Sequence, residues 1–119
     1  PMVYACGGLL RERSGTFIGR EALRFFSKRR TTRYFLSATG VDAEAGVTDL
    51  TLEDNEVKQA MAANSGEVVL LADRSKFGEV SLMQVMPWRR IDHLVTDASG
   101  QDVADFRGQA GSLCDIHFV

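Results

Sequence analysis

The feature that most constrains this chain is the run at 67–71 (EVVLL), rich in aliphatic and β-branched residues, which opens into a polar stretch at 72–78 (ADRSKFG). A short apolar run that ends in polar residues and Gly is typical of a buried parallel strand. Ligands of open α/β sheets gather at the carboxyl ends of such strands. We therefore expect Asp73, Ser75 and Lys76 at a site for an anionic, hydroxylated small molecule. A plain solvated turn is the alternative that these residues leave open.

A second strand is predicted at 33–37, where Tyr34, Phe35 and Leu36 form another apolar run. It ends in small polar residues and Gly, among which Thr39 and Asp42 are candidates to hydrogen-bond sugar hydroxyls. Two parallel strands would deliver both polar ends to the same edge of one sheet. The alternative is a Gly/Asp turn without a ligand.

The N-terminal part predicts one strand and one helix. Residues 2–6 are short and apolar and are closed by Gly7-Gly8, which can either approach a ligand closely or form a turn. Residues 16–28 carry apolar side chains at helical spacing, so we expect a helix there. Basic residues follow at 28–30, where cations suit a helix C-terminus.

A further helix is predicted to begin at Thr51, because Thr51-x-x-Asp54 resembles a capping box. Acidic residues in its first turn are favoured by the helix dipole, and Asp54 and Glu56 could instead accept hydrogen bonds from a polyol. Asp54 and Lys58 are four residues apart and are expected to pair on the surface, and Lys58 is also a secondary candidate for the ligand site. Gly66 would end this helix before the strand at 67–71.

The remaining elements alternate. We expect an apolar stretch at 80–85, a turn opened by Pro87, a strand at 91–95, a helix at 101–111 and a strand at 113–119. The order β, α, β, α, β, turn, β, α, β predicts an α/β fold with a mainly parallel sheet and helices on both faces.

Composition limits the function. A chain of 119 residues favours one domain, and a net charge of −2 argues against a nucleic-acid surface in these residues. No apolar run approaches the roughly 18 residues that span a membrane, and no signal peptide is recognisable. Cys6 and Cys114 are expected as buried, reduced thiols of an intracellular protein, with a disulfide as the alternative. His93 and His117 have no partner at ligand spacing, so no metal site and no cofactor are predicted.

Six stretches together resemble one known family. Residues 34–42 (YFLSATGVD) and 46–48 (GVT) are similar to Phe-Leu-Gly-x-x-Gly-Ile-Asp and Gly-Leu-Thr. Residues 52–61 resemble an acidic helix start that ends in Val-Lys-Arg-Ala-Met. Residues 71–78 resemble Leu-Ala-Asp-Ser-Ser-Lys-Phe-Gly, and residues 91–97 resemble Ile-Asp-x-Leu-Ile-Thr-Asp. Residues 7–11 fit Gly-Gly-x-x-Arg. The family is the DeoR-type bacterial transcriptional regulators, and the part resembled is their C-terminal effector-sensing domain.

The resemblance implies a Rossmann-like domain similar to sugar-phosphate isomerases. Such regulators are generally cytoplasmic homo-oligomers that bind operator DNA through an N-terminal helix-turn-helix and sense a phosphorylated sugar. Residues 1–119 would be the C-terminal part of that sensor domain. The helix-turn-helix, and an opening βαβ unit with a Gly-Ser-Thr phosphate loop, would lie outside these residues.

Roles follow from the resemblance by position. Lys76 would contact the phosphate or sugar oxygens of the effector. Thr39, Gly40 and Asp42 would line the sugar. Gly7 and Gly8 would shape the floor of the pocket. Asp54 or Glu56 would be the helix carboxylate near the pocket. Arg74 stands where the family has Ser, and Ser37 where it has Gly, and both changes could alter which effector fits.

Three functions from different classes are weighed. The first is a non-enzymatic sensor module of a transcriptional repressor. The second is an aldose–ketose isomerase, in which Asp42, Glu56 and Lys76 could supply a general base and an oxyanion stabiliser. The glycine-rich lysine loop of pentose-phosphate isomerases has no counterpart in the sequence, which disfavours turnover. The third is an oligomerisation unit without ligand binding.

Overall fold

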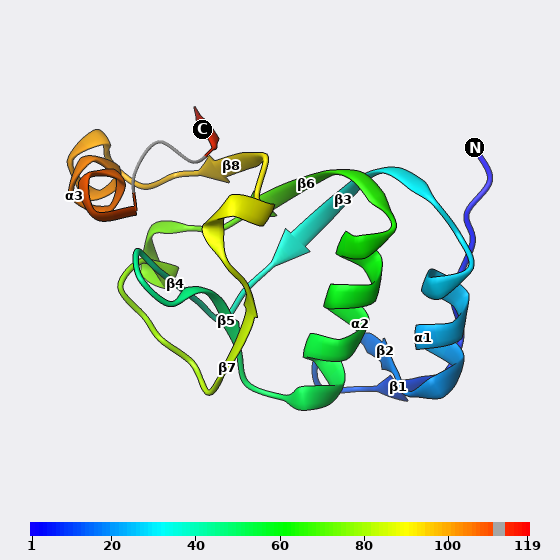
Figure 1. The fold of residues 1–119 in the computed structure, drawn as a ribbon. Helices are drawn as coiled ribbons and strands as arrows, with labels where there is room; N and C mark the ends of the chain where they lie inside the picture. Colours follow the sequence, from blue (N-terminus) through cyan, green and yellow to red (C-terminus); the bar gives the residue numbers. More distant parts are fainter. Residues whose placement is uncertain (111–113) are drawn as a thin grey trace.

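The computed structural model describes residues 1–110 and 114–119, which form an α/β fold (Figure 1). Its centre is a parallel sheet of four strands in the order β3-β6-β8-β9. These strands are β3 (Thr31–Ser37), β6 (Ser65–Leu71), β8 (His93–Thr96) and β9 (Asp115–Phe118). The predicted fold class is confirmed, and so are parallel strands over 33–37 and 67–71.

A second, antiparallel sheet was not predicted. It contains β4 (Gly40–Asp42), β5 (Gly46–Asp49) and β7 (Met83–Met86). The hairpin between β4 and β5 has a three-residue loop, and Gly46 leaves it with a φ of 77°. The carboxylate of Asp42 accepts hydrogen bonds from two backbone N–H groups of this loop, at 3.0 and 2.8 Å. Such a loop followed by a left-handed Gly is a common hairpin connection.

Three α-helices and two short 3-10 turns complete the fold. The helices are α1 (Arg20–Ser27), α2 (Leu52–Ala63) and α3 (Gly100–Ala110), and the turns are η1 (Arg74–Lys76) and η2 (Trp88–Arg90). As predicted, Thr51 caps α2 by accepting a hydrogen bond from the backbone N–H of Asp54 at 3.3 Å. Pro87 opens η2, which was also predicted.

The N-terminal prediction was wrong in two places. Residues 2–6 form no strand, and the side chains of Met2, Val3 and Tyr4 are 84%, 90% and 75% exposed. A strand needs a neighbour for its backbone hydrogen bonds, and the described residues supply none here. The predicted helix at 16–28 begins only at Arg20. Its first residues form β2 (Thr16–Ile18), which pairs with β1 (Leu9–Arg11) in an antiparallel hairpin.

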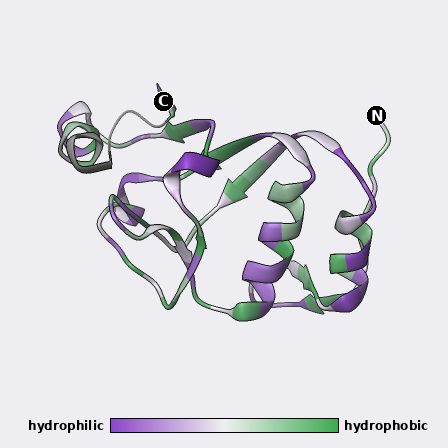
Figure 2. Cartoon of the chain, in the orientation of Figure 1, coloured by the Kyte–Doolittle hydropathy of each residue, from purple (hydrophilic) through white to green (hydrophobic). Residues whose placement is uncertain are grey.

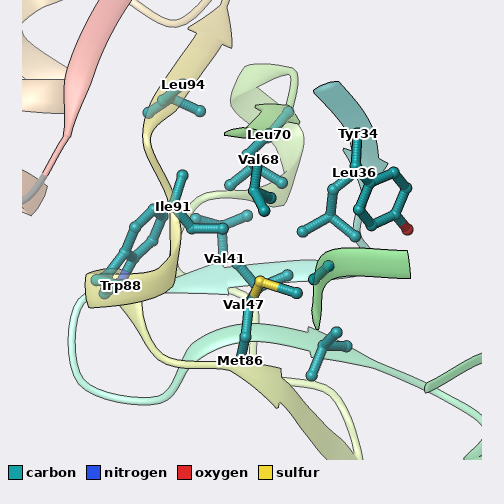
Figure 3. Packing of buried hydrophobic residues seen from close by; sticks show 13 residues of the cluster. Tyr34, Leu36, Val41, Val47, Val68, Leu70, Met86, Trp88, Ile91 and Leu94 are labelled. Atoms are coloured by element: carbon teal, nitrogen blue, oxygen red, sulfur yellow. The ribbon is translucent and has the colours of Figure 1, made fainter. Parts of the chain in front are cut away.

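The hydrophobic core lies between one face of the parallel sheet and the elements that connect its strands. Leu36, Leu70 and Leu94 point from the parallel sheet toward Val41 and Trp88 on the other side of this core (Figure 3). Hydrophobic residues are concentrated along β3 and β6, whereas α2 shows polar residues outward (Figure 2). The core therefore fixes where β3 and β6 end relative to the antiparallel sheet.

Among the described residues, helices cover one face of the parallel sheet, not both as expected. The strand order advances in one direction, and right-handed connections then place all linking segments on the same face. In Figure 1, α2 and the antiparallel sheet lie below β3 and β6. On the opposite face, Phe35 is 59% and Leu71 46% exposed.

Candidate functional site

The polar ends of β3 and β6 meet at one edge of the parallel sheet. Ser37 and Leu71, the last residues of these strands, are paired in register. The segment after η1 then runs beside β4, because Phe77 forms a bridge with Val41 and the N–H of Gly78 donates to the Val41 carbonyl at 2.8 Å. The turn that carries Lys76 is therefore adjacent to the strand that carries Gly40 and Asp42.

A compact ionic cluster lies at the end of β3. The ammonium group of Lys58 on α2 forms an ion pair with the carboxylate of Asp49 and donates to the carbonyl of Ser37 at 2.7 Å. The hydroxyl of Thr39 donates to the other oxygen of Asp49 at 2.6 Å. The side chains of Lys58 and Asp49 are only 16% and 11% exposed. Two residues predicted for the site, Thr39 and Lys58, are thus joined by a carboxylate that was not predicted.

The cluster sets the charge state of its neighbours. Burial alone would raise the pKa of Asp49, but hydrogen bonds from Lys58 and Thr39, with the Lys58 charge, hold that pKa below its ordinary value. Burial raises the pKa of Tyr34 well above its ordinary value, and the negative charge of Asp49 adds to this effect. The carboxylate is therefore ionised and the phenol neutral at neutral pH.

A second network joins the start of α2 to the first hairpin. The guanidinium group of Arg11 donates to Asp54 at 2.5 Å and to the hydroxyl of Thr51 at 3.0 Å. Thr16 donates to the other oxygen of Asp54 at 3.1 Å. The expected surface pair between Asp54 and Lys58 does not form, because Arg11 and Asp49 each offer a closer partner. Asp54 thus ties β1 and β2 to α2.

The η1 turn is ordered by its own side chains. The carboxylate of Asp73 accepts hydrogen bonds from the hydroxyl of Ser75 and from its backbone N–H, and these bonds lower the pKa of Asp73. The backbone N–H of Arg74 donates to Asp97 at 2.9 Å. Lys76 is half-buried, and its amine makes no hydrogen bond with the described residues. Asp73 and Ser75 therefore shape the loop, and the Lys76 amine remains available.

Three other predicted residues have structural roles in this geometry. Gly40 is buried, and a Cβ atom there would lie 2.3 Å from the carbonyl oxygen of Glu79. A Cβ on Gly8 would lie 2.8 Å from the carbonyl oxygen of Ile18. The carboxylate of Asp42 accepts the two backbone hydrogen bonds of the β4–β5 loop described above. Gly7 has a φ of 71°.

Glu56 lies apart from these groups. It is exposed on α2 and makes no ion pair or hydrogen bond with the described residues. Of the two helix carboxylates that the resemblance left open, Asp54 is therefore the one that contacts other polar residues, Arg11 and Thr16 among them.

Two hollows include some of the predicted site residues in their lining, but Lys76, Thr39 and Gly40 line neither of them. One of about 290 Å³ lies beside β3 and α2. It is lined by apolar residues, several of them aromatic, and by four polar residues, Thr16, Ser37, Asp54 and Lys58. The other, of about 300 Å³, is lined by Asp42, Arg74, Asp102 and neighbouring residues. Phe106 of α3 closes this second hollow by packing edge-on against Phe77 and Trp88, with ring centroids 5.2 and 4.7 Å apart.

Two histidines that look isolated in the sequence are neighbours in the structure. Nδ1 of His93 lies 3.2 Å from Nε2 of His117 on the adjacent strand β9. This pairing depends on the β8–β9 register, which sequence spacing does not reveal. Among residues 1–110 and 114–119, no group of three or more His, Cys, Asp or Glu is placed to hold a metal ion. Cys6 and Cys114 are both half-buried, and they do not form a disulfide with each other.

Comparison with known proteins identifies the class. The sequence model of the DeoR C-terminal sensor domain matches residues 1–98. The glycerol-3-phosphate regulon repressor of Escherichia coli strain K12 is 31% identical over 96 residues, covering 81% of this chain and 38% of that protein. The transcriptional regulator GlpR of Haloferax volcanii is 32% identical over 97 residues, with 82% and 38% covered. IolR of Bacillus subtilis is 32% identical over 90 residues, with 76% and 36% covered.

The chain therefore belongs to the DeoR family of transcriptional regulators and corresponds to their C-terminal sensor domain. It spans less than two fifths of the length of the curated relatives described above. In the described residues, no helix has both the length and the apolar character required to cross a membrane.

Proposed function

We propose that this chain is the effector-sensing part of a DeoR-type transcriptional repressor and binds a phosphorylated sugar at the carboxyl edge of its parallel sheet. The observation that carries the proposal is the meeting of two polar strand ends, with the Lys76 turn lying against the strand that holds Gly40 and Asp42. Ligands of open α/β sheets bind at such edges.

The two lysines at this edge have different roles in the proposal. Lys58 is held by Asp49 and the Ser37 carbonyl, so its charge is already balanced. Lys76 has an amine without a hydrogen-bond acceptor among the described residues, and it supplies the positive charge for a phosphate. Thr39 and Asp42 lie on the neighbouring segment, where they face the sugar.

The proposed module senses its ligand and does not turn it over. The regulator acts in the cytoplasm as a homo-oligomer, and operator DNA is bound by a helix-turn-helix outside residues 1–119. Effector binding changes operator affinity through the coupling free energy between the two sites. Support comes from the family assignment and from the names of the relatives, which are transcriptional regulators or repressors.

Thermal-shift and calorimetric titration of the complete regulator with glycerol 3-phosphate, fructose 1-phosphate and glucose 6-phosphate would test the proposal. Inorganic phosphate and the unphosphorylated compounds are the ligand controls. Lys76→Ala should weaken binding by about tenfold or more, because a charged hydrogen bond is lost. Lys28→Ala, at the exposed C-terminus of α1, should bind like the wild type.

Each outcome has a definite meaning. If no phosphorylated sugar binds, the ligand class is wrong. If one binds equally well to Lys76→Ala, the class stands but the site is wrong. A coupled aldose–ketose isomerase assay on the same protein should show no turnover, and sustained conversion of substrate would replace the sensor by an enzyme.

A further inference from the structure

Positive charge is concentrated in one stretch of an otherwise acidic chain. Residues 11–33 contain eight of the 14 Lys and Arg residues and two of the 16 Asp and Glu residues. This stretch therefore carries a charge of +6, whereas the rest of the chain carries −8. The net charge of −2 argues against a nucleic-acid surface only when it is averaged over the whole chain, because the average conceals this separation.

Helix α1 places part of this charge along one line. Arg20, Arg24 and Lys28 follow one another at intervals of four residues, so they lie on the same side of the helix. Ala22, the buried residue of α1, faces the opposite side. The three cations and the nearby Arg30 are exposed, and α1 lies beside α2 at one end of the molecule (Figure 1). We call these four cationic residues the basic stripe.

The described part of the chain does not neutralise the basic stripe. None of its four side chains forms an ion pair with a described residue, whereas Arg11, Arg33 and Lys58 all do so elsewhere. Arg29, which lies within the same segment, has a structural role. Its guanidinium group lies 3.8 Å from the ring centroid of Phe25 and donates to the carbonyl of that residue at 3.3 Å. The charge of the basic stripe is therefore available to a partner.

The stability of the helix does not account for the basic stripe. Like charges four residues apart repel each other and destabilise a helix. Cations are favoured at a helix C-terminus, which suits Lys28 and Arg30, but they are disfavoured at the N-terminus. Arg20 is the first residue of α1, and Arg24 lies between two other cations. These two arginines are therefore placed at a cost to α1, which points to an anionic partner.

The composition of this surface decides between a protein and a nucleic acid as the partner. Interfaces between proteins have a centre that is depleted of charged residues. None of the large hydrophobic residues that are exposed in the described chain lies within residues 19–33. The phosphate backbone of DNA, by contrast, is bound through charge. Residues four apart on a helix are separated by about 6 Å, close to the rise of about 6.8 Å for two phosphates of one strand.

We propose that the basic stripe binds the phosphate backbone of DNA that flanks the operator. These contacts add affinity to those of the helix-turn-helix and carry no sequence information, so they strengthen binding to all duplexes alike. The proposal rests on the proposed function in one respect, which is that the complete regulator binds DNA. It is independent of the effector and of the turn that carries Lys76.

The salt dependence of DNA binding tests the proposal. Each phosphate contact releases counterions and adds about 0.9 to the slope of log Kd against log salt concentration. The complete regulator would be titrated against a fluorescein-labelled duplex of mixed sequence, about 60 base pairs or about 200 Å long, with fluorescence anisotropy as the measurement. Between about 50 and 200 mM KCl, Arg20→Gln/Arg24→Gln should lower the slope by about 1.8 per bound subunit, a roughly tenfold smaller loss of affinity than in the wild type.

Matched variants separate charge at this place from charge in general. Arg89→Gln/Arg90→Gln removes two exposed cations from η2 and should leave the slope unchanged. Arg20→Lys/Arg24→Lys keeps both charges and should keep the slope of the wild type. The melting temperature of Arg20→Gln/Arg24→Gln should not fall, because the substitution removes repulsion along α1. A lower melting temperature together with a lower slope would instead give the stripe a structural role.

The other results also have definite meanings. A complete regulator that binds no duplex would refute the proposed function and this proposal with it. Binding with an unchanged slope in Arg20→Gln/Arg24→Gln would refute the role of the basic stripe alone. Equal flattening in Arg89→Gln/Arg90→Gln would show a general effect of charge without a site. If the substitution lowers the oligomer mass in analytical ultracentrifugation, the stripe binds the acidic surface of a second copy instead of DNA.

Discussion

Lys58 pairs with Asp49, nine residues earlier in the chain, and not with Asp54 on its own helix. The pair links α2 to the end of β5, and through Ser37 and Thr39 it also holds the end of β3. A half-buried ion pair with additional hydrogen bonds at both partners fixes geometry more than it adds stability. Here it fixes the strand end at which we place the effector.

Removing the cation should be costly. Lys58→Met keeps most of the aliphatic stem but leaves the Asp49 carboxylate poorly solvated and without its ion pair. We expect a loss of about 2–4 kcal/mol in the free energy of unfolding, measured by urea denaturation. Glu56→Gln, which changes an exposed charge on the same helix, should cost less than about 0.5 kcal/mol. Equal stability of the two variants would show that the pair contributes little.

Stability should also depend on pH through Asp49. Its pKa is lowered in the folded chain, so near pH 4 the unfolded chain, with a carboxyl pKa of about 3.9, binds more protons. The contribution of Asp49 is therefore fully present above the unfolded pKa and is lost as the pH falls through the folded pKa. In Asp49→Asn, the free energy of unfolding should decline less between pH 6 and pH 3 than in the wild type.

Other carboxylates with lowered pKa values, such as Asp73 and Asp102, are present in both proteins. The difference between the two pH profiles therefore isolates Asp49. Parallel profiles would mean that Asp49 has the same pKa folded and unfolded. The measurement is chemical denaturation at each pH, with fluorescence of Trp88, the chain's one tryptophan, as the probe.

Local patterns in the sequence predict those elements that are long and periodic. The strands at 33–37 and 67–71 have uninterrupted apolar runs, and α2 has both a cap at Thr51 and helical spacing. Short elements are not predicted by such patterns. Residues 16–18 continue the apolar spacing of α1, so the spacing alone predicts one helix where Gly19 in fact separates β2 from α1. β4 and β5 have three and four residues, too few to show a period.

The candidate site was predictable at the level of strand ends but not of partners. That β3 and β6 end together follows from parallel pairing. That Lys58 pairs with Asp49 depends on how α2 packs against the antiparallel sheet, and no spacing encodes it. The His93–His117 contact likewise arises from the register of strands 24 residues apart. One weak indication of the role of Asp49 is that this acidic residue ends β5, a strand whose residues are all buried.

Gly40 provides a final test of how closely the η1 segment must approach β4. A Cβ atom on Gly40 would lie 2.3 Å from the Glu79 carbonyl oxygen and 2.8 Å from the Thr48 hydroxyl. Both neighbours are held in the sheet or loop, so Gly40→Ala should cost about 1–3 kcal/mol in the free energy of unfolding. Gly100→Ala, with open space around its Cβ position, should cost about 0.5 kcal/mol or less. If both alanines were tolerated equally, the backbone around residues 40 and 79 would have to be further apart than this fold places it, and the Lys76 turn with it.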